Sequence, residues 1–267
     1  MKTIFLGMLA VLFLSCAPPV ETTPAATPIY DREIVDLTWT LDESTIAWPT
    51  SPGFELELQF EGVTEGGFYY SSHVLHGPEH GGTHIDAPVH FYQGRHTTDQ
   101  IPLTQLIGPG VKIDAIEPCA EDRDYLVGVR EFEAWESANG PFPKGAIVLI
   151  ETGFGAYWPD RERYMGTAEL GPDAVAKLRF PGLDPEAVDW LLEREIRAIG
   201  IDTPSTDRGQ STDFAAHVAL SDANIPGFEN VARLETLPSQ GFTVIALPAK
   251  IGGGSGGPLR IIAMIDG

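Results

Sequence analysis

A cluster of histidine and aspartate side chains lies within eleven residues of the chain. Its members are His80, His84, Asp86 and His90, in the run His80-Gly81-Gly82-Thr83-His84-Ile85-Asp86-Ala87-Pro88-Val89-His90. Imidazole and carboxylate groups are ligands that divalent zinc and manganese bind, and a catalytic metal keeps one coordination position open for water. The residue types and their spacing therefore indicate a metal site rather than scattered surface histidines.

The backbone of this segment is expected to form a turn that leads into an extended strand. The glycines and the proline within the run argue against a helix, although His80 and His84 have helical spacing. In an extended segment, His84 and Asp86 leave the same side of the backbone because they are two residues apart. The glycine pair would then fold the chain so that His80 rejoins them.

The N-terminal end of the chain resembles an export signal. Residues 1–15 contain Lys2 and a short apolar run, which is too short for a typical membrane-spanning helix. Ser15-Cys16 resembles a lipoprotein junction, at which the cysteine is lipidated, and residues 16–30 form a Pro/Thr-rich tether. We therefore expect an exported bacterial protein, either periplasmic or anchored to a membrane through Cys16. A plain secretory signal is the alternative.

The composition limits the partners of the exported part. The chain has 38 acidic and 17 basic residues, a formal net charge of −21. It therefore lacks the basic surface that nucleic-acid binding needs, and anionic lipid would not attract it, so membrane contact is expected only through a lipid anchor at Cys16. Cys16 and Cys119 are the only cysteines, which allows at most one internal disulfide.

Hydrophobic patterns predict an α/β domain with a substantial mixed sheet. Segment 54–60 alternates strictly between apolar and polar residues, which predicts a strand with one buried and one wet face. Asp184 and Pro185 open an amphipathic segment and predict a helix over 184–192. Weaker helical patterns cover 129–138 and 214–223. The other predicted strands are 34–41, 68–75, 111–116, 146–151, 198–202, 242–247 and 259–265.

The histidine-rich run resembles the HxGTHxDxPxH signature of the putative cyclase family, which includes bacterial kynurenine formamidases and isatin hydrolases. Further blocks resemble the family in the family's order and reach nearly to the end of the chain. They are Gly200-Ile201-Asp202-Thr203-Pro204-Ser205, His217, Phe228-Glu229-Asn230, Leu247-Pro248-Ala249-Lys250 and Gly256-Gly257-Pro258-Leu259-Arg260. Only about the first thirty residues lie outside the resemblance.

The resemblance implies a single domain over residues 31–267 with a swivelling β/β/α-type fold and a mixed sheet core. It also implies one or two divalent ions, zinc or manganese. His80 and His84 match ligands of the first metal, and Asp86 matches a carboxylate that bridges to the second. His217 matches a ligand of the second metal, and Glu229 matches the other bridging carboxylate.

Two more residues acquire roles from the resemblance. His90 matches the histidine that handles protons, although a third ligand of the first metal is an alternative reading. Trp48 matches an aromatic residue that contacts the substrate, but Thr50 and Ser51 depart from the Gly-Asp that often follows in the family. Asp202 has two open readings, a partner that orients a ligand histidine or a turn carboxylate.

The expected function is hydrolysis of a carbon–nitrogen amide bond by metal-bound hydroxide, with His90 as general acid and base. The first candidate is an arylformamidase with a small-molecule substrate similar to N-formylkynurenine. Two alternatives are a cyclic amide or lactone hydrolase similar to isatin hydrolases, and a non-catalytic exported lipoprotein that binds a metal or ligand. A pure binding protein would not need a proton-handling histidine beside an open metal position. The resemblance also implies a homo-oligomer, either a dimer or a tetramer.

Overall fold

The computed structural model describes residues 28–266 of the chain. The predicted signal, residues 1–15, and the tether as far as residue 27 lie outside the described residues. The strands are β1 (Ile34–Asp36), β2 (Glu55–Val63), β3 (Tyr69–His76), β4 (His84–Asp86), β5 (Ile107–Asp114), β6 (Leu126–Val127), β7 (Ile147–Glu151), β8 (Gly182–Leu183), β9 (Ala198–Ile201), β10 (Gly227–Glu229), β11 (Phe242–Pro248) and β12 (Gly256–Ile265). The α-helices are α1 (Leu103–Leu106), α2 (Ile116–Glu121), α3 (Val129–Asn139), α4 (Arg161–Met165), α5 (Pro172–Val175), α6 (Glu186–Leu192) and α7 (Ala215–Asp222).

Residues 32–266 are organised by one mixed sheet that closes on itself. The strand order is β1-β12-β11-β5-β7-β9-β10-β4, and an additional pairing of β12 with β4 joins the two ends. Strands β5, β7, β9 and β10 run parallel, whereas β11, β12 and β4 pair antiparallel with their neighbours. The core is therefore a barrel-like mixed sheet.

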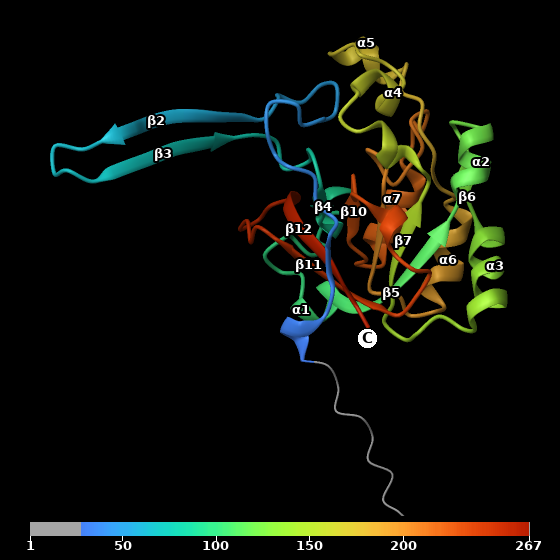
Figure 1. The fold of residues 1–267 in the computed structure, drawn as a ribbon. Helices are drawn as coiled ribbons and strands as arrows, with labels where there is room; N and C mark the ends of the chain where they lie inside the picture. Colours follow the sequence, from blue (N-terminus) through green and yellow to red (C-terminus); the bar gives the residue numbers. More distant parts are fainter. Residues whose placement is uncertain (1–27, 267) are drawn as a thin grey trace, which may run out of the picture. The chain divides into compact units, whose positions relative to one another are not determined.

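The central strands are buried on both faces, which explains their continuous apolar sequence. In β7, Val148 and Ile150 belong to one core cluster with residues of α3 and α6, while Ile147 and Leu149 belong to a second cluster with residues of β4, β11 and β12. Helices α2, α3 and α6 lie along one side of the sheet (Figure 1). The α/β class and the mixed sheet predicted from the sequence are confirmed.

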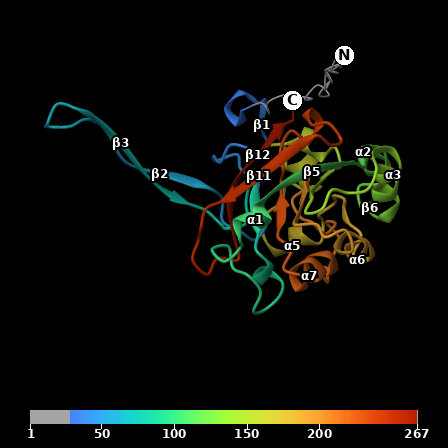
Figure 2. The same cartoon turned by 90° about the horizontal axis from the view of Figure 1, so that it is seen from below.

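The hairpin formed by β2 and β3 departs from the sequence-based prediction. Strands β2 and β3 pair with each other and with no other described strand, and the hairpin extends away from the closed sheet (Figures 1 and 2). Almost every residue of β2 is exposed, on both faces. The prediction of one buried face for 54–60 is therefore wrong. None of the described residues outside the hairpin covers either of its faces.

Over residues 28–266, none of the helices combines the length and the apolar composition that crossing a bilayer requires.

Candidate active site

Strand β4 brings most of the histidine-rich run into the sheet. It lies between β10 and β12, and in the register with β10 His84 is directly opposite Glu229. Opposed residues of adjacent strands project from the same face, so His84, Asp86 and Glu229 share one face of the sheet. Gly256 of β12 leaves room for the His80 ring beside β4, because a Cβ atom at position 256 would lie 2.5 Å from that ring.

Five side chains form two groups of donor atoms that share Asp86. The groups are His80, His84 and Asp86, and Asp86, His217 and Glu229, with the donor atoms of each group within 4.8 Å of one another. Asp86 Oδ1 lies 2.7 Å from His80 Nδ1 and 3.2 Å from His84 Nε2, and Asp86 Oδ2 lies 3.1 Å from His217 Nε2. Glu229 Oε2 lies 3.4 Å from His84 Nε2, and its Oε1 lies 3.0 Å from His217 Nε2. Asp86 and Glu229 therefore each direct one carboxylate oxygen toward His84 and the other toward His217.

The chemistry of these donors fits divalent metal ions. His84 Nδ1 donates a hydrogen bond of 2.9 Å to the Gly82 carbonyl, whereas its buried Nε2 has no hydrogen-bond partner among the described residues. Burial acts to lower the pKa of His84, but Asp86 and Glu229 outweigh it and raise this pKa to about 10. The two carboxylates thus make the site favourable for cations, and the fixed orientation of His84 leaves Nε2 free to bind one.

The carboxylates stay ionised although they are buried. Burial would raise the pKa of Asp86, but the three surrounding histidines outweigh it and hold this pKa well below its usual range. Burial and the charge of Asp86 act to raise the pKa of Glu229, but its hydrogen bond to His217 and its close approach to His84 outweigh them and lower this pKa. The carboxylates of Asp86 and Glu229 are therefore both in the anionic form that a metal ion requires.

Sequence reasoning missed Asp207, which orients His217. The Nδ1–H group of His217 donates to Asp207 Oδ2 at 2.5 Å, so that Nε2 faces Asp86 and Glu229. The backbone N–H groups of Ala216 and His217 also donate to this carboxylate. Asp207 lies ten residues before His217 on the approach to α7, a separation that no local periodicity marks.

Ser255, which the sequence analysis also missed, holds the His80 ring in place. The Nε2–H group of His80 donates to Ser255 Oγ at 3.0 Å, and Ser255 Oγ donates to a carboxylate oxygen of Glu79 at 2.6 Å. Ser255 comes from the segment before β12, far from His80 in the sequence. Its role depends on the closure of the sheet and could not be read from spacing.

The structure decides between the two readings of Asp202. Its carboxylate accepts hydrogen bonds from the backbone N–H groups of Thr152 and Gly153 and from the Thr152 hydroxyl. Burial raises the pKa of Asp202 to about 6. Asp202 therefore holds the loop after β7 and orients none of the histidines of the two donor groups.

A cavity of about 250 Å³ opens onto the donor groups. Trp48 lines it and packs edge to face against Phe180, with ring centroids 6.5 Å apart. An isolated bridge between Ala47 and Gly81 fixes this wall beside the histidine-rich turn. Phe91 and Phe214, which the sequence analysis did not select, also line the cavity. Their ring centroids are 5.2 Å apart.

His90 also lines the cavity but belongs to neither donor group of the described residues. It lies in a 3-10 turn, Pro88–His90, and its ring stacks on His80 with centroids 3.9 Å apart. Desolvation by the cavity walls lowers the pKa of His90, against the opposing charge of Asp86. A neutral imidazole at this position can accept a proton near neutral pH.

The fold and the site define a class of protein, an α/β protein with a buried cluster of histidines and carboxylates that could hold a metal ion. The family model described as "Putative cyclase" matches residues 35–208. The chain therefore belongs to the putative cyclase family.

Relatives with curated names cover most of the chain. An isatin hydrolase of Roseibium aggregatum is 32% identical over 248 residues, which cover 87% of this chain and 92% of the relative. A kynurenine formamidase of Salinibacter ruber is 29% identical over 239 residues, which cover 86% and 96%. The solved structure of isatin hydrolase A from Labrenzia aggregata, bound to benzyl benzoate, is 34% identical with a TM-score of 0.78 and covers 88% of this chain and 94% of that one.

The role of Asp207 leads to a prediction about metal affinity. Asp207→Asn keeps the shape of the side chain but replaces a strong anionic acceptor, so the affinity for zinc or manganese should fall by about 10- to 100-fold. Competition with a chromogenic chelator measures this affinity. Asp213→Asn, an equal charge change at an exposed position before α7, is the control and should leave the affinity unchanged. Equal affinities for both variants would show that Asp207 does not support the metal site.

Proposed function

We propose that the protein is a metal-dependent hydrolase of a carbon–nitrogen amide bond. The observation that carries the proposal is the arrangement of Asp86 and Glu229, each with one oxygen toward each of the two donor groups. His80, His84 and His217 complete these groups, which would hold one or two zinc or manganese ions. Bound there, the metal would polarise the amide carbonyl and activate the attacking water. The relatives named as hydrolases and formamidases support this reaction class.

The cavity favours a compact, neutral aromatic amide as the substrate. Three aromatic residues, Trp48, Phe91 and Phe214, line it, and neither lysine nor arginine is among its described lining residues. An amino-acid formamide such as N-formylkynurenine would bring a carboxylate that no cationic side chain of the lining could pair with. Opening of a cyclic aryl amide, as in the isatin hydrolase relatives, is therefore the first candidate. Hydrolysis of an aryl formamide is the second, and the kynurenine formamidase relatives support it.

The residues around the cavity divide the remaining work of the reaction. The aromatic walls hold the ring of the substrate so that its carbonyl carbon faces the donor groups. Water adds its oxygen to this carbon, the carbon–nitrogen bond breaks, and the leaving nitrogen gains a proton. His90 takes the proton released by the water and delivers it to the nitrogen, because its ring lies at the cavity beside His80.

An assay of the metal-loaded protein against a substrate panel tests the proposed function. Isatin and related cyclic aryl amides should be turned over fastest, formanilides more slowly, and small aliphatic amides least. Treatment with a chelator should abolish turnover, and zinc or manganese should restore it. Absence of turnover on the whole panel by protein that retains its metal would instead support a binding protein.

His90→Ala should separate proton transfer from metal binding. Loss of a general acid–base group lowers turnover by about 10² or more, while metal content should stay nearly intact because His90 belongs to neither donor group. Steady-state kinetics and elemental analysis of the same sample measure both. His96→Ala, a histidine outside the cavity lining, is the control. Metal loss in His90→Ala would make His90 a ligand.

Trp48→Ala should weaken binding of aromatic substrates selectively. Ring packing contributes about 0.5–1.5 kcal/mol beyond area burial, so KM for an aryl amide should rise about 2- to 13-fold more than KM for an aliphatic amide. Metal content should not change. Trp190→Ala removes a tryptophan that packs on Phe132, away from the cavity, and is the control. Equal KM changes on both substrates would restrict Trp48 to a structural role.

Export and self-association are also part of the proposal. The N-terminal sequence supports export and attachment to a membrane through lipidated Cys16. Cys16→Ser should then release the protein from the membrane fraction of its native cell or block its processing, which fractionation and immunoblotting would show. A wild-type protein found only in the soluble fraction would contradict the anchor. Family resemblance supports a homo-oligomer, either a dimer or a tetramer.

A further inference from the structure

One side of the cavity, the Trp48 wall, is formed by Ile46, Ala47, Trp48 and Ser51. The wall belongs to none of the described strands, so the ladder of the sheet does not hold it. Its backbone joins the histidine-rich turn at the bridge between Ala47 and Gly81, where the N–H group of Gly82 donates to the Ile46 carbonyl at 3.0 Å. This contact holds only the edge of the wall that faces the turn.

Arg161 holds the opposite edge of the Trp48 wall. Successive carbonyl groups of an extended segment point in opposite directions, so the Ala47 carbonyl points away from the turn that binds the Ile46 carbonyl. The Nη1–H group of Arg161, at the start of α4, donates to the Ala47 carbonyl at 3.1 Å. The Pro49 carbonyl accepts from the N–H group of Gly171, just before α5, at 2.8 Å. Trp48 therefore lies between two carbonyls that are bound to the layer of α4 and α5.

The guanidinium group of Arg161 has a single acceptor in the described part of the chain, the Ala47 carbonyl. Its Nε and Nη2 atoms are buried and have no hydrogen-bond partner there. Burial alone lowers the pKa of Arg161, which indicates that no carboxylate lies close enough to compensate the charge. Arginine stays charged even so, and a hydrogen bond from a charged donor is strong where water is excluded. The bond to Ala47 is therefore a strong anchor for the wall.

We propose that Arg161 is a positioning residue that holds Trp48 in place for the ring of the substrate. Arg161 does not line the cavity, so it acts through the backbone at Ala47 and Trp48. Phe180 supports the Trp48 ring, whereas Arg161 holds the backbone that carries it. A wall that is fixed before binding loses less conformational entropy when the substrate enters. The effect on substrate binding rests on the proposed function, whereas the effect on the wall does not.

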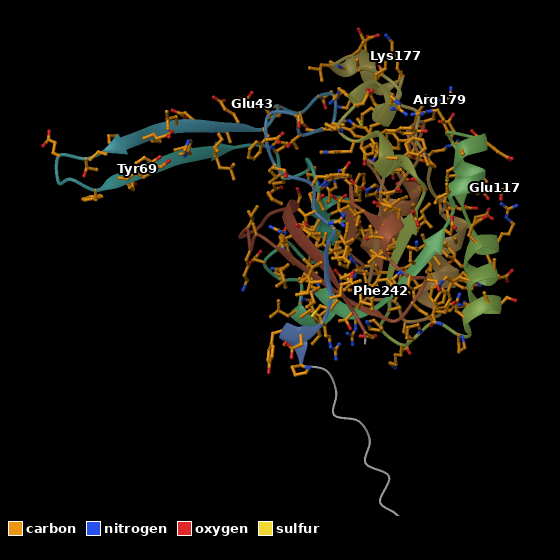
Figure 3. The ribbon with its side chains drawn as sticks, viewed as in Figure 1. Glu43, Tyr69, Glu117, Lys177, Arg179 and Phe242 are labelled. Carbon is orange, nitrogen blue, oxygen red and sulfur yellow. The ribbon has the colours of Figure 1, made fainter. Side chains whose placement is uncertain are left out.

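The layer that supplies Arg161 is separate from the two donor groups. Helices α4 and α5 lie together at one end of the molecule (Figure 1), and Figure 3 shows Lys177 and Arg179, which follow α5, at the same end. The N–H group of Arg179 donates to the Met165 carbonyl at 2.9 Å, which joins this segment to α4. None of the described metal-donor residues belongs to this layer. Loss of the Arg161 side chain should therefore leave the metal donors in place.

Hydrogen–deuterium exchange of the full, metal-loaded chain tests the wall without a substrate. Arg161→Met removes the donor but keeps most of the length of the side chain. A hydrogen bond from a charged donor is equivalent to about 10- to 100-fold in a local opening equilibrium, so the amides of residues 46–51 should exchange faster by about this factor. Arg163→Met, the same change at an exposed position of α4, is the control and should leave this exchange unchanged.

Steady-state kinetics on the aryl and aliphatic amides then test the link to substrate binding. Arg161→Met should reproduce the selective effect of Trp48→Ala, a KM rise about 2- to 13-fold larger for an aryl amide, with kcat and metal content nearly unchanged. In a chain that already carries Trp48→Ala, Arg161→Met should add no further selective rise, because both changes act on one interaction. Arg161→Lys keeps a charged donor, so its exchange and KM should lie between those of the wild type and Arg161→Met.

Two results would overturn the proposal. One is unchanged exchange of residues 46–51 in Arg161→Met, or in Arg161→Lys if Arg161→Met loses its helical circular dichroism. The other is a selective KM rise of the same size with and without the Trp48 ring, which would place the action of Arg161 elsewhere in the site. A wild type that turns over none of the amides would instead refute the proposed function, and the exchange measurement would still decide whether Arg161 holds the wall.

Discussion

The close approach of two buried carboxylates, Asp86 and Glu229, is the constraint on which the site depends. Buried charges are costly unless they are compensated, and three histidines, His80, His84 and His217, provide the compensation here. The closed sheet imposes the approach, since β4 is held between β10 and β12. Metal ions that replace protons on the histidines would add binding energy to the folded state alone, so metal loading and folding stability are linked.

The part of the site that local chemistry determines was predictable from the sequence. Alternation along a strand places His84 and Asp86 on one side, and the structure has them in β4 with His80 folded back by the glycine turn. His217 and Glu229 could be assigned only through family resemblance, because their approach to Asp86 depends on how α7 and β10 pack. Asp207 and Ser255 had no sequence signal, since hydrogen bonds between distant segments set their roles.

The fold shows the same division between local and long-range information. Long apolar strands such as β7 and β11 and the three predicted helices were identified with small shifts of their ends. Strands β6, β8 and β10 have two or three residues each and were missed, because so short a segment has no period to detect. The alternation of residues 54–60 predicted a strand correctly but its burial wrongly. Alternation reports which residues could be buried, while the partner surface decides whether they are.

The cavity wall and the hairpin belong to one continuous stretch of chain. Ala47 and Trp48 line the cavity, and six residues after Trp48, Phe54 lines a second, apolar pocket at the base of the hairpin together with Leu75 and Ile251. Residues 47–54 form a connecting segment that is held at one end by the bridge from Ala47 to Gly81 and at the other end by the hairpin. Movement of the hairpin base would therefore reach the Trp48 wall within six residues of chain. A substitution at the hairpin base can then change substrate affinity without touching the cavity, so distance from the metal donors is a poor guide to functional effect in this chain.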